Sequence, residues 1–231
     1  ITRYGFLLTA ITIAAIMAYT LLLTDKFHLQ YLLPSFTLPF KNYLLGAHIV
    51  MIMPFSDVAV FLVFIPFMYR PHEFGRAMVK GVVIAAVMML IVVLRDTVVL
   101  GKFISILSMP SYYAARYIDI GNILNRVEIV YAIILVGLLF YKVSVFYYAT
   151  VSGITHLFGM PAYKIFVYII GVLICVYAAA SFSSVAAHVN WKMTAAPIFG
   201  SFFVAILPLL TLLVSLIRGS VSKKERLTDT P

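Results

Sequence analysis

Residues 46–69 read GAHIVMIMPFSDVAVFLVFIPFMY, an apolar stretch long enough to cross a bilayer but interrupted by Pro54, Ser56 and Asp57. Asp57 lies near the middle of this stretch, so a helix would place it close to the centre of the ~30 Å hydrocarbon core. Because Pro54 has no backbone N–H, carbonyl groups one turn earlier, near Val50, lose helical partners. The sequence therefore predicts a transmembrane helix that is broken at the membrane midplane beside a carboxylate.

The break has two interpretations. One is a proline kink, in which a buried partner satisfies Asp57 and no ligand binds. The other is a functional cavity, because a carboxylate is costly in lipid and is expected to face a bundle interior or water. The coincidence of a midplane charge with a helix break favours the cavity.

The composition excludes a soluble domain. The chain has 64% hydrophobic and 11% charged residues and a mean hydropathy of +1.08, whereas soluble domains are about 45–50% apolar. Six apolar runs reach the length of a spanning helix, and none alternates as an outer-membrane strand does. We therefore expect an all-α integral membrane protein with a single membrane domain. Its helices are expected at about 4–24, 44–69, 77–100, 123–150, 164–187 and 197–217.

The connections carry most of the polar residues. Residues 101–122 predict an amphipathic outer loop, with Pro110 placed to begin a short helix and Gly121 to end it. Arg95 and Asp96, near the end of the third helix, are interpreted as interfacial anchors. Residues 189–194, VNWKMT, predict a further connection, whose tryptophan and lysine are typical of a membrane interface.

The net charge of +9 is explained by membrane topology and anionic lipid rather than by nucleic acid, because the basic residues border apolar spans. Six crossings put both termini on one side, together with the basic link 70–80 and the basic tail 218–231. That side holds the larger share of the lysines and arginines, so we expect both termini of this segment to be cytoplasmic.

Motifs of enzymes are missing from the sequence. It contains no zinc-protease, phosphate-loop or serine-hydrolase motif, and Asp57 has no second carboxylate at its depth. The single cysteine, Cys175, excludes an internal disulfide and a cysteine-based metal site, and His48 is the only histidine near the break. We therefore expect neither an enzyme nor a bound cofactor or metal.

Three segments carry a family resemblance: PFSD at 54–57, LSMPSYYAARYIDIGNILNRVE at 107–128, and YAIILVGLLFYK at 131–142. Together they resemble the endospore germination permease family, the amino acid permease-like B subunits of nutrient germinant receptors. The most specific matches are Pro110-Ser111-Tyr112, Ile120-Gly121 and Arg126-Val127-Glu128, followed by Lys142. The resemblance suggests structural or gating roles for five residues: Tyr112, Tyr113, Arg126, Glu128 and Lys142. For Lys142 the alternative is a side chain that extends along the helix to place its charge at the membrane surface.

The resemblance implies a fold like that of the amino acid-polyamine-organocation transporters, a LeuT-like inverted repeat in which two helices are unwound at the substrate. Family members have about ten helices, so this chain resembles the last six, and it begins without methionine, as a processed or longer protein would. The break then implies substrate contacts at Met53, Pro54, Phe55 and Ser56, with Asp57 binding an ammonium group or orienting the broken strand. A helix lining the same cavity would contribute Ile134, Gly137 and Leu138, for which ordinary bundle packing is an equal alternative.

The leading hypothesis is a nutrient-sensing subunit of a spore germination receptor that binds a small amino acid. Its partners would be the A- and C-type receptor subunits and the lipid of the spore inner membrane, with no nucleic acid. A secondary transporter that couples an amino acid to H⁺ or Na⁺ is the second hypothesis, because burial could make Asp57 a proton carrier. A channel-forming subunit is the third.

Overall fold

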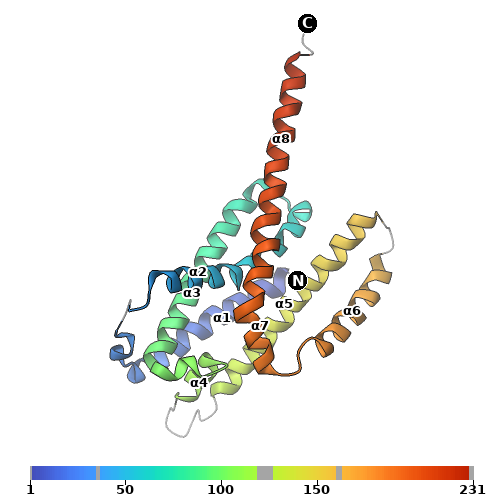
Figure 1. Ribbon diagram of the computed structural model, residues 1–231. Helices are drawn as coiled ribbons and strands as arrows, with labels where there is room; N and C mark the ends of the chain where they lie inside the picture. The colour runs from blue at the N-terminus through green and yellow to red at the C-terminus, as the bar shows by residue number, and fades with distance from the viewer. Residues whose placement is uncertain (1, 35–36, 119–126, 160–162, 229–231) are drawn as a thin grey trace. The chain divides into compact units, whose positions relative to one another are not determined.

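A computed structural model describes residues 2–34, 37–118, 127–159 and 163–228, and every regular element in these ranges is helical (Figure 1). This confirms the expected all-α fold class. The α-helices are α1 (Thr2–Leu22), α2 (Phe40–Ile52), α3 (Phe74–Leu100), α4 (Pro110–Arg116), α5 (Val127–Phe158), α6 (Tyr163–Ala180), α7 (Val185–Ser201) and α8 (Leu207–Thr228). Short 3₁₀ helices are η1 (Thr24–Lys26), η2 (Leu29–Leu32), η4 (Pro71–Glu73) and η5 (Gly101–Ser105); η3 (Phe55–Phe67) is a longer one, and η6 (Phe202–Ile206) is a π-helix.

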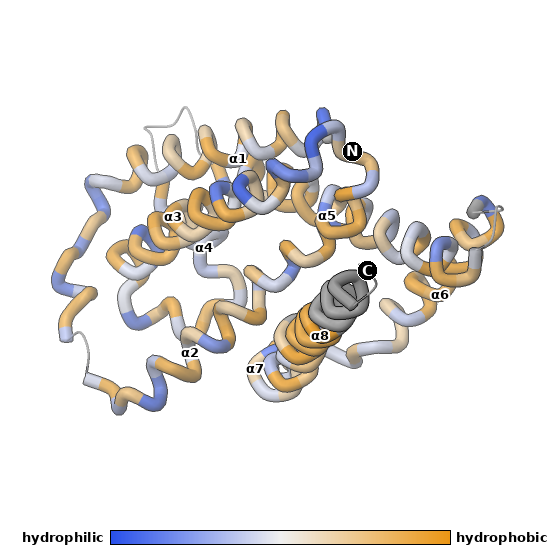
Figure 2. The backbone as a smooth tube through the Cα atoms, turned by 90° about the horizontal axis from the view of Figure 1, so that it is seen from above, coloured by the Kyte–Doolittle hydropathy of each residue, from blue (hydrophilic) through white to orange (hydrophobic). Residues whose placement is uncertain are grey.

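Four helical stretches in the described part of the chain are long and apolar enough to cross a membrane: Arg3–Leu22, Phe40–Phe67, Pro71–Ser105 and Val127–Phe158. A fifth span results if Lys164–Ala180 and Val185–Ser201 count together, although these two helices meet at a bend of 101°. Apolar residues cover most of α1, α3 and α5 (Figure 2), and many of their large side chains are exposed on the outside. Such a surface fits lipid rather than water.

The expected connection at 189–194 is wrong, because these residues lie inside α7. The stretch contains neither glycine nor proline, and its polar residues do not interrupt the helix. The chain turns instead between Ala180 and Val185, within a run of small residues. Ser184 explains the new start, because its hydroxyl accepts a hydrogen bond of 3.1 Å from the Ala187 N–H and caps α7.

The chain divides into two compact units. Unit 1 comprises Ile1–Thr37 and Val60–Ile170, and unit 2 comprises Leu38–Ala59 and Gly171–Pro231. The broken span therefore contributes its first half to unit 2 and its second half to unit 1. That all helices form one membrane domain stays a prediction.

In unit 1, α1 and α5 pack side by side in opposite directions. Gly5, near the start of α1, meets the ring of Tyr141 so closely that a Cβ atom at position 5 would overlap it. Near the other end, the Tyr19 hydroxyl donates to the Val127 carbonyl at 3.4 Å, at the beginning of α5. The glycine therefore permits a close helix contact without lipid between the helices.

The core of unit 1 lies where α1 and α3 end and α4 begins. Leu23 and Ala114 are fully buried there, together with Val98, Leu100 and other apolar residues of the same cluster. Pro110 begins α4, as expected, since its missing N–H costs nothing at the first helical position. Gly121, expected to end this helix, lies outside the described residues; α4 ends at Arg116.

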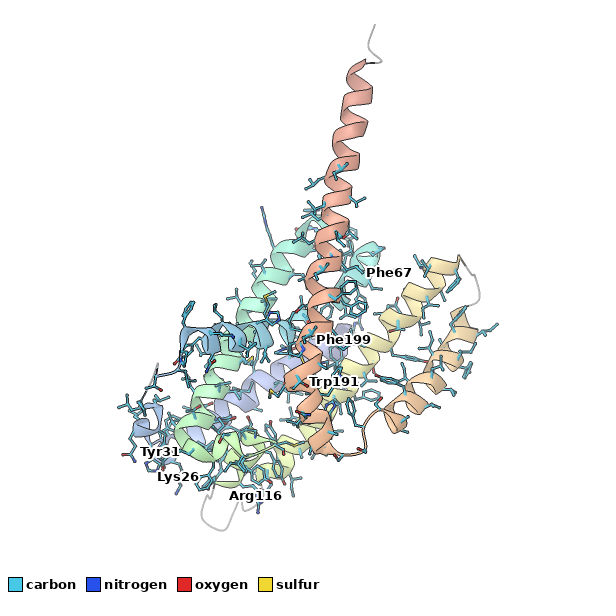
Figure 3. The ribbon with its side chains drawn as sticks, in the orientation of Figure 1. Lys26, Tyr31, Phe67, Arg116, Trp191 and Phe199 are labelled. Carbon is cyan, nitrogen blue, oxygen red and sulfur yellow. The ribbon has the colours of Figure 1, made fainter. Side chains whose placement is uncertain are left out.

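The η1–η2 segment folds back onto the same end of unit 1. The His28 N–H donates to the Val98 carbonyl at 3.0 Å, and the Tyr31 ring packs on Gly101, whose φ of +54° favours glycine. Lys26, Tyr31 and Arg116 accordingly lie toward one end of this unit (Figure 3). The end is thus closed by short helices and bordered by basic residues.

In unit 2, α2 packs on α7, and α7 continues through η6 into α8 with little change of direction (Figure 1). η6 is a single π-helical stretch of five residues, which widens the helix locally. Pro197 lies inside α7 just before it. This combination marks the α7–α8 helix as locally irregular next to its contact with α2.

Candidate functional site

The break predicted from Pro54 is present in the structure. α2 ends at Ile52, Met53 is extended with φ −132° and ψ 112°, and η3 begins at Phe55. Because Pro54 has no N–H, the Val50 carbonyl cannot form its helical hydrogen bond to that residue. The interruption therefore follows from the chemistry of one residue.

Local hydrogen bonds hold the broken segment. The Ser56 hydroxyl donates to the Ile52 carbonyl, which replaces a backbone donor after the end of α2. The Asp57 N–H donates to the Pro54 carbonyl at 3.2 Å, the i→i+3 pattern that η3 continues. Two backbone carbonyls at the break, those of Ile52 and Pro54, thus find partners within four residues.

The structure places all five predicted contact residues at this break. Met53, Phe55, Ser56 and Asp57 are half-buried, and Pro54 is exposed. The four half-buried side chains are therefore accessible without lying on the open surface. Their role in binding an amino acid stays a prediction.

Two residues of α7 support the break, and sequence reasoning missed both. Ile52, at 2% exposure, packs on Gly200 so closely that a Cβ atom there would overlap its side chain. One turn earlier, His48 Nε2 lies 3.0 Å from the Ser201 hydroxyl. η6 begins at the next residue, Phe202. The signal available in the sequence was the small pair Gly200-Ser201 within an apolar helix.

The predicted α5 residues face α1 and α3 within unit 1. Ile134 and Leu138 line a pocket of about 210 Å³. Gly137 instead contacts α1, with the Leu8 Cδ2 3.5 Å from the position of its missing Cβ. Two of the three predicted residues therefore line one pocket, and the third, Gly137, lies in the contact between α5 and α1. That this pocket and the break form one cavity stays a prediction.

The interfacial interpretation of Arg95 and Asp96 is wrong. Their exposures are only 4% and 3%, because α4 covers this end of α3. Arg95 donates to Asp96 Oδ1 from Nε at 2.9 Å and from Nη2 at 2.7 Å. The Ser111 hydroxyl of α4 donates to the other oxygen, Asp96 Oδ2. This buried ion pair connects α3 to α4.

Two of the residues to which the resemblance gave structural or gating roles lie beside this pair. The Tyr112 ring centroid is 5.8 Å from that of Tyr113 and 6.4 Å from that of Tyr131 on α5. Tyr112 is half-buried and Tyr113 is exposed. Aromatic contacts thus join α4 to α5 next to the ion pair.

The other residues with proposed gating roles are spread along α5. Glu128 is half-buried in its first turn, and Lys142 is exposed with Nζ 5.7 Å from the centroid of the Phe146 ring. Arg126 lies outside the described residues. The structure does not bring Glu128 and Lys142 together, since they are about four turns apart.

A second, larger pocket of about 600 Å³ lies between α5 and α6 and was not predicted. It is lined by hydroxyl-bearing residues of α5, among them Ser144, Tyr147 and Thr155. The Tyr147 hydroxyl donates to the Val167 carbonyl of α6 and thus joins the two helices across it. Its signal in the sequence was a polar stripe at helical spacing.

In the described part of the chain, no three His, Cys, Asp or Glu side chains are grouped as metal ligands would be. Cys175 is free and exposed.

Comparison with known proteins identifies the family. A family model described as a spore germination protein, that of the spore permeases, matches residues 1–184 of the 231. Searches of curated proteins and of solved structures gave no match. The matched region includes the broken span, the Arg95–Asp96 pair and α5, and the family is of a transport or receptor type rather than enzymatic. The chain is thus a multi-pass membrane protein and belongs to the spore germination permease family.

Proposed function

We propose that this chain is the nutrient-sensing membrane subunit of a spore germinant receptor and that a small amino acid binds at the break between α2 and η3. The observation that carries the proposal is the interruption of an apolar span at Met53–Pro54, with Ser56 and Asp57 directly after it. Backbone groups without helical partners are tolerated at membrane depth only where protein, water or a ligand satisfies them.

The residues at the break suit a zwitterion. The Val50 carbonyl, which lacks its helical N–H, is an acceptor for an ammonium group, and the Asp57 carboxylate offers a charged one. N–H groups in the first turn of η3, which have no earlier turn of the same helix to bond, are donors for a carboxylate. Met53 and Phe55 provide apolar surface for a small side chain.

Sensing requires that the amino acid bind one conformation of the bundle more tightly than another. The contact of α2 with α7 offers a route for such a change, because Ile52 and His48 connect the broken segment to Gly200 and Ser201. A- and C-type receptor subunits in the spore inner membrane would then detect the change. Both termini of this segment would face the cytoplasm.

The test is the nutrient dose response of spores that carry Ser56→Ala or Asp57→Asn. Ser56→Ala removes a hydroxyl group and Asp57→Asn removes a negative charge from the break, so we expect the nutrient concentration for half-maximal ion release to rise about tenfold, the equivalent of about 1.4 kcal/mol of binding. Ion release is recorded from spores exposed to single amino acids.

Two matched variants serve as controls. Ser144→Ala removes a hydroxyl that also bonds a carbonyl four residues earlier, but in the continuous helix α5, and Asp25→Asn removes an exposed carboxylate. Both are expected to respond as the parent does. If the two break variants also respond as the parent, the assignment of the site to the break is wrong.

A coupled transporter is the second candidate, and the half-buried Asp57 beside the break favours it. A carboxylate at this position could bind and release a proton during each transport cycle. Counterflow of a labelled amino acid into vesicles containing the purified chain, lost in Asp57→Asn, would support transport. Nutrient-specific ion release without any counterflow would favour sensing alone.

A further inference from the structure

The buried ion pair in unit 1 leaves part of its arginine unused. A guanidinium group has five N–H donors. Arg95 directs its Nε and one N–H of Nη2 to the same oxygen of Asp96, and no other described residue accepts a hydrogen bond from it. The two parallel N–H groups of the Nη1–Nη2 edge, and the second N–H of Nη1, are therefore free of partners within the described residues.

The free edge belongs to a residue that lines a pocket. Arg95 is 4% exposed, yet it forms part of the wall of the 210 Å³ pocket between α1, α3, α4 and α5. Ser111, Tyr19 and Tyr131 contribute hydroxyl groups to the same wall, and Ile134 and Leu138 contribute apolar surface. The pocket thus combines one charged donor group and a few hydroxyl groups with a wall that is otherwise apolar.

We propose that this pocket binds a small monocarboxylate with an apolar body, whose carboxylate accepts two hydrogen bonds from the Nη1–Nη2 edge of Arg95. The two parallel N–H groups of that edge match the two oxygens of a carboxylate. Asp96 cannot serve this edge, because its Oδ1 already accepts both other donors and its Oδ2 accepts from Ser111. Asp96 instead fixes the orientation of the guanidinium.

The size of the pocket limits the ligand. Its volume of about 210 Å³ equals that of about seven water molecules at ~30 Å³ each. Pockets for drug-sized ligands are larger, at about 300–1,000 Å³. The apolar part of the ligand would lie against Ile134 and Leu138, two of the three α5 residues predicted to line a substrate cavity. This site lies within unit 1 and does not rest on amino acid recognition at the break.

The experiment measures binding of propionate to the purified full chain in lipid nanodiscs, with propionamide as the neutral molecule of nearly the same shape. Propionate is expected to bind at least tenfold more tightly than propionamide, because only the carboxylate can accept both N–H groups. Arg95→Lys retains the charge but removes the paired donors, and it is expected to weaken propionate binding about tenfold.

Two pairs of variants test the place of binding. Ala15→Leu fills the pocket from α1, whereas Ala14→Leu adds the same volume at the neighbouring exposed position. Ile134→Phe and Ile133→Phe form a second pair on α5, in which only residue 134 lines the pocket. The pocket-filling member of each pair is expected to lose propionate binding, and its partner is expected to retain it. The second pair decides the question if Ala15→Leu does not fold.

Three results would overturn the proposal: no binding of propionate, equal binding of propionate and propionamide, or equal binding by both members of a folded pair. The readout also separates this site from the proposed function. If propionate binds but the Ser56 and Asp57 variants respond to nutrient as the parent does, the monocarboxylate site at Arg95 is supported and amino acid binding at the break is contradicted. A shifted nutrient response without propionate binding would do the reverse.

Discussion

Helix α3 and the broken span Phe40–Phe67 both carry an acidic residue within a membrane-length apolar stretch, but they accommodate it in different ways. Asp96 of α3 is 3% exposed and bonds to Arg95 and Ser111 through both oxygens. Asp57 is only half-buried and follows directly on an interruption of the backbone. One carboxylate is enclosed by its partners, and the other stands at an irregular, accessible segment.

The difference teaches how a polar group in a membrane helix can serve structure or function. A closed ion pair connects helices, since removing either partner leaves a buried charge. An accessible break offers groups that a ligand can use, since its local bonds are few. The following variants, ordered from the largest expected effect to the smallest, test whether the two regions differ in this way.

Asp96→Ala is expected to have the largest effect. It leaves the Arg95 guanidinium buried without its carboxylate, which should lower the free energy of unfolding by about 3–5 kcal/mol. Reversible unfolding of the purified protein in detergent measures the change. Asp25→Ala, at an exposed position of η1, is the control and should change the stability by less than ~0.5 kcal/mol. Equal stability of the two variants would contradict the burial of the pair.

Gly200→Ala tests the contact that supports the break. The added Cβ would overlap the side chain of Ile52, so we expect a loss of about 1–3 kcal/mol in the free energy of unfolding. Gly46→Ala, in α2 with open space around its Cβ position, should instead stabilise the protein by about 0.5–1 kcal/mol. In a protein that already carries Ile52→Ala, the change Gly200→Ala should cost less stability than it does in the parent, because the side chain that it would overlap has been removed. If Gly200→Ala and Gly46→Ala shift the thermal midpoint equally, the two helices are not in close contact.

Ser56→Ala tests the local bond at the break. The Ile52 carbonyl loses the hydroxyl that replaces its backbone donor, so we expect a cost of about 0.5–1.5 kcal/mol in stability. Ser144→Ala should cost less, because the Phe140 carbonyl retains a backbone donor in the continuous helix α5. Chemical unfolding of both variants under identical conditions gives the comparison. A larger loss in Ser144→Ala would refute the special role of Ser56.

Glu73→Gln is expected to have the smallest effect. Its carboxylate lies 3.2 Å from Arg70 Nη1, but the two side chains are 52% and 63% exposed. Exposed pairs of this kind contribute about 0–1 kcal/mol, so the change in the free energy of unfolding should be below about 0.5 kcal/mol. A loss of stability comparable to that of Asp96→Ala would show that solvent exposure does not determine how much each of the two ion pairs contributes to stability.

The features that the sequence predicted best are local. Pro54 specifies the end of α2 by its missing N–H, and Pro110 specifies the beginning of α4 by its ring geometry, so neither depends on distant residues. The all-α fold likewise follows from hydropathy and length. The family resemblance rested on the loop at 107–128, part of which lies outside the described residues.

The features that the sequence did not predict depend on packing between distant segments. Arg95-Asp96 at the end of an apolar run is typical of an interface, and only the position of α4 reveals that the pair is buried. The close approach of Ile52 to Gly200 joins residues that are far apart in the chain. The bend after Ala180 was hidden in the sequence because residues 181–184, SFSS, contain neither glycine nor proline and lie between apolar helices.

The π-helical stretch Phe202–Ile206 has a consequence for how this chain tolerates insertions and deletions. A π-helical turn holds one residue more than an α-helical turn, so it behaves as a single inserted residue. Because the wider turn absorbs that residue, deleting one residue here would restore a continuous α-helix with little rotation of α8 about its axis, whereas deleting one residue from the regular part of α7 would rotate α8 by about 100°. The face that α8 presents to its surroundings is thus protected against the loss of one residue at this point, and a frame-preserving deletion of a single codon would leave it nearly unchanged here but not in the regular part of α7.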